Sequence, residues 1–193
     1  MARTRLSRSD RYDQLVEVSW ALVRTEGADA LTLGRLAEHA GVAKPVVYSH
    51  FASRAELLAA LFTEFDDRQT VMLEESLHAA PASLNGRARA IANSYVGCAL
   101  AQGRELTGVL AALEGSPELE QVKRSAERAY SDRCRSILEP FSGSGGISAS
   151  SITAIFGAAE ALSHAAVSEV LGPEEATAEL TELIVAVVGR ADR

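Results

Sequence analysis

The stretch Thr32-Leu-Gly-Arg-Leu-Ala-Glu-His-Ala-Gly-Val-Ala-Lys-Pro-Val-Val-Tyr-Ser-His-Phe51 decides how this chain folds. It predicts a short helix over 33–40, a turn at Gly41 and a second short helix over 44–50. Thr32 can cap the first helix, and Pro45 suits the first turn of the second because its missing N–H has no helical partner there. Small or apolar side chains fall where two helices would cross steeply, at Leu36, Ala37, Val42, Val47 and Phe51. The stretch is therefore a candidate helix-turn-helix.

Helical patterns continue on both sides of this stretch. Upstream, Ser9 can cap a helix over 10–26 that ends at Gly27. Downstream, Ser53 and Glu56 form a capping box at the start of a fourth helix. Later helices are predicted over 83–101, 104–114, 117–138, 148–171 and 174–190.

The pattern predicts an all-α fold of about nine helices. An amino-terminal three-helix domain over 10–54, which contains the candidate helix-turn-helix, follows a flexible basic arm over 1–9. A larger helical domain covers 55–193. Composition agrees with an all-helical chain, because aromatic residues make up only 5% of it and there are only 5 prolines.

Composition also excludes several classes of protein. The net charge is −7, yet residues 1–54 carry a basic excess and the acidic excess lies beyond them, which suits a protein that offers polyanions one face. The two cysteines and four histidines are scattered, so we expect neither a metal nor a cofactor. No nucleophile motif or phosphate-cradling glycine loop suggests an enzyme. The absence of a long apolar run or a signal sequence predicts a cytoplasmic protein that does not engage membranes.

The residues from Gly27 to Leu58 resemble the DNA-binding domain of the tetracycline-repressor (TetR) family. The family pattern has a threonine at the start of the second helix, which is Thr32 here, and Ala-Gly-Val at the turn, here 40–42. A Tyr-x-His-Phe tetrad follows at 48–51, and then a basic residue, Arg54, and Glu-x-Leu-Leu, for which this chain has Glu56-Leu57-Leu58. The resemblance implies a DNA-binding regulator. Residues 10–54 would be its helix-turn-helix DNA-binding domain, and residues 55–193 its helical effector-binding and dimerisation domain.

The resemblance and donor chemistry together assign roles within this domain. Lys44 can donate to O6 and N7 of guanine, and the ring of Pro45 can pack on the methyl group of thymine. Val46 stands where the family often has a polar contact residue. The side chains at family positions that hold phosphates, where they fix register without reading sequence, are Thr32, Tyr48, His50 and Arg54, to which Arg35 is added as a candidate.

The remaining helices supply candidates for dimerisation and for an effector site. One recognition helix gives poor specificity, so a homodimer through the last two helices is expected. Its candidate interface residues are Ile152, Ile155, Ala159, Leu162, Val167, Leu180, Leu183, Ile184 and Val187. By the family pattern, the middle helices would hold a small-molecule site, with candidate residues Tyr95, Cys98, Leu106, Leu110, Leu113, Phe156 and His164.

The sequence therefore predicts a repressor that a small hydrophobic or amphipathic ligand releases from a palindromic operator in double-stranded DNA. The alternative is a DNA-binding regulator or scaffold that a protein partner controls, without any small-molecule effector.

Overall fold

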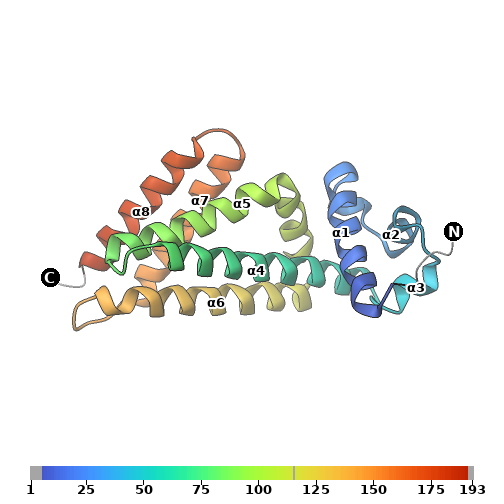
Figure 1. The fold of residues 1–193 in the computed structure, drawn as a ribbon, viewed down its shortest axis with the longest axis horizontal. Helices are drawn as coiled ribbons and strands as arrows, with labels where there is room; N and C mark the ends of the chain where they lie inside the picture. The colour runs from blue at the N-terminus through green and yellow to red at the C-terminus, as the bar shows by residue number, and fades with distance from the viewer. Residues whose placement is uncertain (1–5, 115, 191–193) are drawn as a thin grey trace. The chain divides into compact units, whose positions relative to one another are not determined.

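A computed structural model describes residues 6–114 and 116–190 (Figure 1). For residues 102–107 and 114 it describes the backbone only. Within the described residues the chain forms eight α-helices, two short 3-10 helices and no strand. The all-α class predicted from the sequence is confirmed. In chain order the elements are α1 (Arg8–Glu26), η1 (Ala28–Ala30), α2 (Leu33–Ala40), α3 (Lys44–Tyr48), α4 (Arg54–Ala79), α5 (Leu84–Glu114), α6 (Pro117–Leu138), η2 (Glu139–Phe141), α7 (Ala149–Val167) and α8 (Pro173–Gly189).

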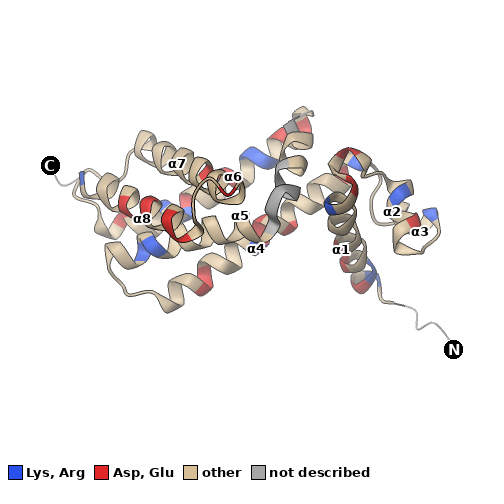
Figure 2. Cartoon of the chain, turned by 90° about the horizontal axis from the view of Figure 1, so that it is seen from above, with Lys and Arg blue, Asp and Glu red and all other residues tan. Residues whose placement is uncertain are grey.

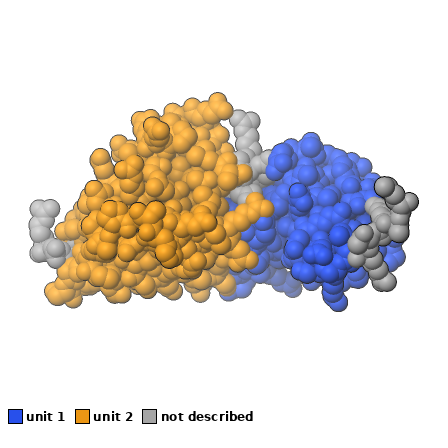
Figure 3. Space-filling model, viewed as in Figure 1, with its two compact units in different colours: residues 1–65, 104–123 blue, residues 66–103, 124–193 orange. Residues whose placement is uncertain are grey.

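The chain divides into two compact units (Figure 3). Unit 1 comprises residues 1–65 and 104–123, and unit 2 comprises 66–103 and 124–193. Helices α4, α5 and α6 therefore each contribute one part to unit 1 and another part to unit 2. The predicted helix-turn-helix lies wholly in unit 1.

Helix α1 begins earlier than the sequence suggested. Its N-cap is Ser7, not Ser9: the Ser7 hydroxyl accepts from the backbone N–H of Asp10 at 3.0 Å, and the Asp10 carboxylate accepts from the Ser7 N–H at 3.3 Å. Only a cap three residues before Asp10 allows this reciprocal pair. Arg8 and Ser9, which the sequence placed in a flexible arm, are thus helical; Arg3 and Arg5 lie outside the described residues.

Helix α5 is a second difference, because it runs without a break where two helices over 83–101 and 104–114 were predicted. Gly103 lies between the two predicted helices. A glycine inside a helix costs only about 1 kcal/mol relative to alanine, so it does not by itself end one. Many helices end where the chain enters the left-handed conformation, as α2 does at Gly41.

The core of unit 2 gathers apolar residues from α4 to α8. Among its most buried members are Leu73, Ile91, Leu138, Leu180 and Ile184. Helices α7 and α8 pack against each other along this core (Figure 1). Such a continuous apolar interior provides the main favourable free energy for folding of the unit.

The end of α7 carries a strained residue. Glu169 has φ of 59°, in the left-handed region that glycine adopts at a helix end. The hydrogen bonds of a Schellman motif form around it: Val170 N–H donates to Ala165 O at 2.9 Å, and Glu169 N–H to Ala166 O at 3.1 Å. This motif ends α7 at Val167, four residues before the predicted end at 171.

We expect Glu169→Gly to stabilise the protein by about 0.5–1 kcal/mol, because glycine relieves the left-handed strain at some cost in unfolded-state entropy. The measurement is chemical denaturation followed by circular dichroism. Glu169→Ala is the matched control: it removes the same carboxylate but keeps the strain. Equal effects of the two substitutions would show that charge, and not backbone conformation, decides the stability at this position.

Candidate nucleic-acid interface

The helix-turn-helix has the geometry that its sequence predicted. The Thr32 hydroxyl accepts from the Arg35 N–H at 3.1 Å and caps α2. Gly41 ends α2 in the left-handed conformation, with φ of 63°. Ala43 precedes α3 and makes no side-chain capping bond, while Pro45 occupies its first turn. Two short helices joined by a tight turn result.

Helix α3 is fixed by its inner face. Val47 is 0% and Phe51 1% exposed, and both belong to the core of unit 1 with Leu36 and Ala37 of α2. The opposite face holds Lys44, Pro45 and Tyr48, which are exposed, Tyr48 to 56%. Val46 is half-buried. The predicted base-reading residues therefore stand on the open side of a helix that buried neighbours hold in place.

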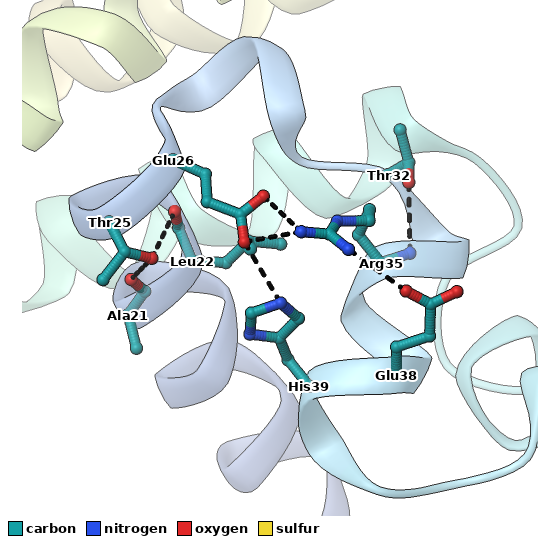
Figure 4. A network of polar contacts seen from close by, with 8 residues as sticks. All are labelled: Ala21, Leu22, Thr25, Glu26, Thr32, Arg35, Glu38 and His39. Atoms are coloured by element: carbon teal, nitrogen blue, oxygen red, sulfur yellow. Dashed lines mark hydrogen bonds and ion pairs between the residues drawn. The ribbon is translucent and has the colours of Figure 1, made fainter.

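A network of ion pairs joins the end of α1 to α2 (Figure 4). A single Arg35 nitrogen, Nη2, donates to both carboxylate oxygens of Glu26, at 2.6 and 2.5 Å. Arg35 Nη1 reaches Glu38 at 3.3 Å, and His39 Nε2 lies 3.2 Å from Glu26. Arg35 was predicted to contact DNA; that contact stays a prediction, and the structure shows that its guanidinium is already paired within the domain.

The hydrogen bond and positive charge of Arg35 hold the pKa of Glu26 below its ordinary value, with a smaller contribution from His39. Glu26 in turn raises the pKa of Arg35, chiefly through the same hydrogen bond. Both side chains are in contact with solvent, so the pair orients α2 on α1 more than it stabilises the fold.

Arg54 also has internal partners. Its Nε donates to Leu31 O and its Nη2 to Ala28 O, both at 2.8 Å. The first residue of α4 is thereby tied to the segment between α1 and α2. The phosphate contact predicted for Arg54 is untested, and the structure adds a positioning role that the sequence did not reveal.

Two further contacts in unit 1 lie far apart in the sequence. Trp20 Nε1 donates to Glu64 Oε2 at 2.6 Å and joins α1 to α4. Tyr12 of α1 packs beside His50 and Phe51, with ring centroids 6.3 and 5.4 Å apart. Neither contact has a sequence signal, because periodicity within one helix does not say which residue of another helix it meets.

The predicted effector residues belong to both units, and their role in binding a ligand stays a prediction. Tyr95 and Phe156 lie in unit 2 with ring centroids 6.0 Å apart, and Cys98 is buried in the same unit. Leu110 and Leu113 belong to unit 1. His164 is exposed on α7, and the side chain of Leu106 lies outside the described residues.

Unit 2 has a buried polar group beside these aromatic rings. The Ser94 hydroxyl donates to Gln69 O at 3.2 Å and lies 3.3 Å from the Tyr130 hydroxyl. The Tyr130 ring also contacts Tyr95 and Phe156, with centroids 6.2 and 5.9 Å away. Burial raises the pKa of both tyrosines and that of Cys134, the last to about 12, so these groups stay neutral at physiological pH. Tyr130 and Ser94 were not among the sequence candidates.

The predicted dimer residues divide by burial. Those in the core of the subunit itself are Ile152, Ile155, Ala159, Leu180 and Ile184. They pack in the core of unit 2, and their predicted place at a dimer interface stays a prediction. Those left half-buried are Leu162, Val167, Leu183 and Val187.

Other kinds of site find no support in the part of the chain that the structure describes. There, no three histidine, cysteine or acidic side chains gather as a metal site would require. Among the same residues, no helix is both long and apolar enough to cross a membrane.

Comparison with known proteins agrees with this geometry. Residues 15–61 match the family model of bacterial regulatory proteins of the tetR family. A curated relative, the HTH-type transcriptional activator FasR of Mycolicibacterium smegmatis, is 33% identical over 73 residues, which are 38% of this chain and 33% of that protein. The match thus spans about a third of the length of that relative.

Solved structures share the fold over nearly the whole chain. SCO4454, a TetR-family transcriptional regulator from Streptomyces coelicolor, superposes with a TM-score of 0.75 at 16% identity, over 96% of this chain and 97% of its own. The fatty acid degradation regulator FadR from Bacillus halodurans gives a TM-score of 0.72 at 18% identity, over 93% and 95%.

The all-helical fold and the exposed face of α3 define a helix-turn-helix DNA-binding protein. The match over residues 15–61 shows that this part of the chain is a DNA-binding domain of the tetR family of bacterial regulatory proteins, and the chain as a whole has the fold of TetR-family regulators.

We expect Glu26→Gln to lower the thermal midpoint at neutral pH more than Glu38→Gln does, because Glu26 holds Arg35 and His39 together whereas Glu38 makes one longer contact. A carboxylate with a lowered pKa contributes stability above its unfolded pKa, and that contribution is lost as pH falls through its folded pKa. The difference between wild type and Glu26→Gln should therefore vanish as pH falls well below the ordinary value of 4.5. A difference that persists in acid would contradict the ion-pair explanation.

Proposed function

We propose that this protein is a homodimeric repressor that binds a palindromic operator through α3. The observation that carries the proposal is that α3 buries Val47 and exposes Lys44, Pro45 and Tyr48, while Phe51, just after the helix, is also buried. Two copies about one turn of DNA apart, roughly 34–36 Å, would read both half-sites. The half-buried Leu162, Leu183 and Val187 of α7 and α8 support the last two helices as the dimer surface.

Each predicted domain has its own function. Residues 10–54 bind DNA, residues 55–193 bind the effector and the second subunit, and the protein acts in the cytoplasm without catalysis. Thr32 hydrogen-bonds as an acceptor to the backbone, so its own hydroxyl hydrogen remains for a phosphate oxygen.

A small hydrophobic or amphipathic ligand releases the protein from DNA. The apolar core of unit 2 and its aromatic cluster of Tyr95, Tyr130 and Phe156 support an apolar ligand, and the Ser94 hydroxyl beside Tyr130 supplies a polar group. One protein of similar fold is named a fatty acid degradation regulator, which supports an acyl chain as the ligand class. The partner-controlled alternative lacks a specific observation in its favour.

Helix α4 supports a two-state mechanism. It is continuous from Arg54 to Ala79 and contributes to both units. Its first residue is tied to Ala28 and Leu31, so a shift of α4 would move the helix-turn-helix. The ligand changes the equilibrium only to the extent that it binds the two states with different affinity.

The test of DNA recognition starts from duplexes that the wild-type protein selects out of random sequence. We expect Lys44→Ala to weaken binding to the selected duplex by about 1–3 kcal/mol and to relax base preference, because it removes donors to base edges. Tyr48→Phe should weaken binding to the selected and the scrambled duplex equally, because the hydroxyl that it removes is expected to contact a phosphate group. Fluorescence anisotropy at fixed salt measures both.

Arg128→Ala, which removes an exposed positive charge from α6, is the control for net charge and should leave the affinity unchanged. If neither Lys44→Ala nor Tyr48→Phe changes the affinity, α3 does not read DNA.

The ligand class is tested with saturated fatty acids of increasing chain length. We expect release of the selected duplex, with affinity improving by about 0.8 kcal/mol per added methylene until the site is filled. Trp20 is the sole tryptophan and is hydrogen-bonded to Glu64 of α4, so its emission should change on release. Phe156→Ala should weaken release without changing duplex affinity in the absence of fatty acid. Failure of every chain length to release DNA would exclude this ligand class.

A further inference from the structure

Three nitrogen-bearing side chains lie at the carboxyl end of α3. Arg8 of α1 donates from Nη2 to the backbone carbonyl of Ser49, the residue that caps the end of α3, at 3.4 Å. Arg11 lies one turn further along the same face of α1. His50 follows Ser49 directly. The helix that begins unit 1 thus brings two guanidinium groups to the end of the recognition helix.

A cluster of tilted rings surrounds His50. Its ring centroid lies 6.3 Å from that of Tyr12 and 6.4 Å from that of Phe51, which is buried. Tyr12 and Phe51 also contact each other, with centroids 5.4 Å apart. The imidazole is therefore packed against rings on two elements, α1 and the segment after α3, and keeps a defined place beside the arginines.

The two arginines also affect the titration of His50. Partial burial, followed by the positive charges of Arg8 and Arg11, holds the pKa of His50 below its ordinary value of 6.5. Both charged groups that act on the imidazole come from α1. Asp10, in the first turn of α1, accepts from the Ser7 N–H in the helix cap and keeps its negative charge. Arg8 and Arg11 are the charged groups that lower the pKa of His50.

We propose that Arg8, Arg11 and His50 form a binding site for one phosphodiester group of DNA, which α1 holds at the carboxyl end of α3. This inference rests on the proposed function of α3. Guanidinium groups bind phosphate oxygens through charge-assisted hydrogen bonds, and an imidazole adds one donor. The site carries no base specificity and sets the register of α3 on the duplex.

Arg8 then has two tasks. Its bond to Ser49 O positions the end of α3, and its guanidinium has further N–H groups with which to bind the phosphate. Arg11 also donates to the side chain of Gln14, which keeps its guanidinium close to α1. If Arg8 were part of a flexible arm for the minor groove, we would expect it to have no partner in the free protein, whereas it donates to Ser49 O.

Phosphate binding at this site is linked to protonation. His50 is neutral in the free protein at neutral pH, because its pKa is lowered. A bound phosphate stabilises the imidazolium, so DNA binding takes up a proton. The affinity for DNA should rise as pH falls, and level off once pH is below the pKa of His50 in the free protein.

The first experiment compares Arg8→Gln and Arg11→Gln with Arg89→Gln, which removes an exposed arginine from α5 in unit 2. The probe is the duplex selected by wild-type protein, alongside a scrambled duplex of equal length. We expect each of the first two variants to lose roughly 5–10-fold in affinity at about 0.1 M salt, with the salt slope reduced by about 1. The loss should be equal on both duplexes, and Arg89→Gln should behave as wild type.

The second experiment measures affinity between about pH 8 and about pH 6, over which an ordinary histidine titrates. Wild-type affinity should increase as pH falls, whereas His50→Gln keeps a donor but should show no such increase. Proton NMR of the free protein should show the pKa of His50 rising in Arg8→Gln. Arg8→Lys, which keeps the charge, should recover much of the lost affinity.

The outcomes separate this site from the proposed function. Normal affinity in both arginine variants, or a loss confined to the selected duplex, overturns the phosphate site while α3 still reads DNA. A wild-type protein that selects no duplex overturns the proposed function and the phosphate site together. Retained pH dependence in His50→Gln overturns the role of His50.

Discussion

A helix as short as α3 cannot keep its shape by itself. It has five residues, and isolated helices below about 12–15 residues are marginal in water. Without a side-chain cap at Ala43, its conformation depends on burial of Val47 and Phe51 against the rest of unit 1. Everything that α3 offers to DNA therefore depends on tertiary packing, and the surrounding helices are arranged to supply it.

Polar contacts then set the position of the packed elements. Arg54 bonds the carbonyls of Ala28 and Leu31, Glu26 holds Arg35, and Trp20 reaches Glu64. Apolar packing is non-directional, whereas these bonds need particular distances and angles. These bonds connect α1, α2 and α4, and none of them covers the outer face of α3.

Charge is distributed to match this arrangement. The chain has a net charge of −7, yet Lys and Arg occur on the helices of the helix-turn-helix and at the start of α1 (Figure 2). Several of these groups have partners inside unit 1: Arg35 pairs with Glu26, and Arg54 with backbone carbonyls. The groups that remain for DNA are fewer than the count of basic residues suggests. Placement in the fold, and not total charge, determines which of them meet phosphate.

The sequence by itself determined the all-helical class and the helix-turn-helix, because caps, glycine turns and helical spacing are local: Thr32, Gly41 and Pro45 each act within a few residues of themselves. Tertiary structure alone decided the partners across elements. It turned Ile152 and Leu180 into core, gave Arg54 an internal role, and brought Arg8 to Ser49 across 41 positions of sequence. An apolar stripe in the sequence predicts that a helix face is buried, but it does not identify the element that covers this face. A basic residue indicates a positive charge, but the sequence does not identify the acceptor that it binds.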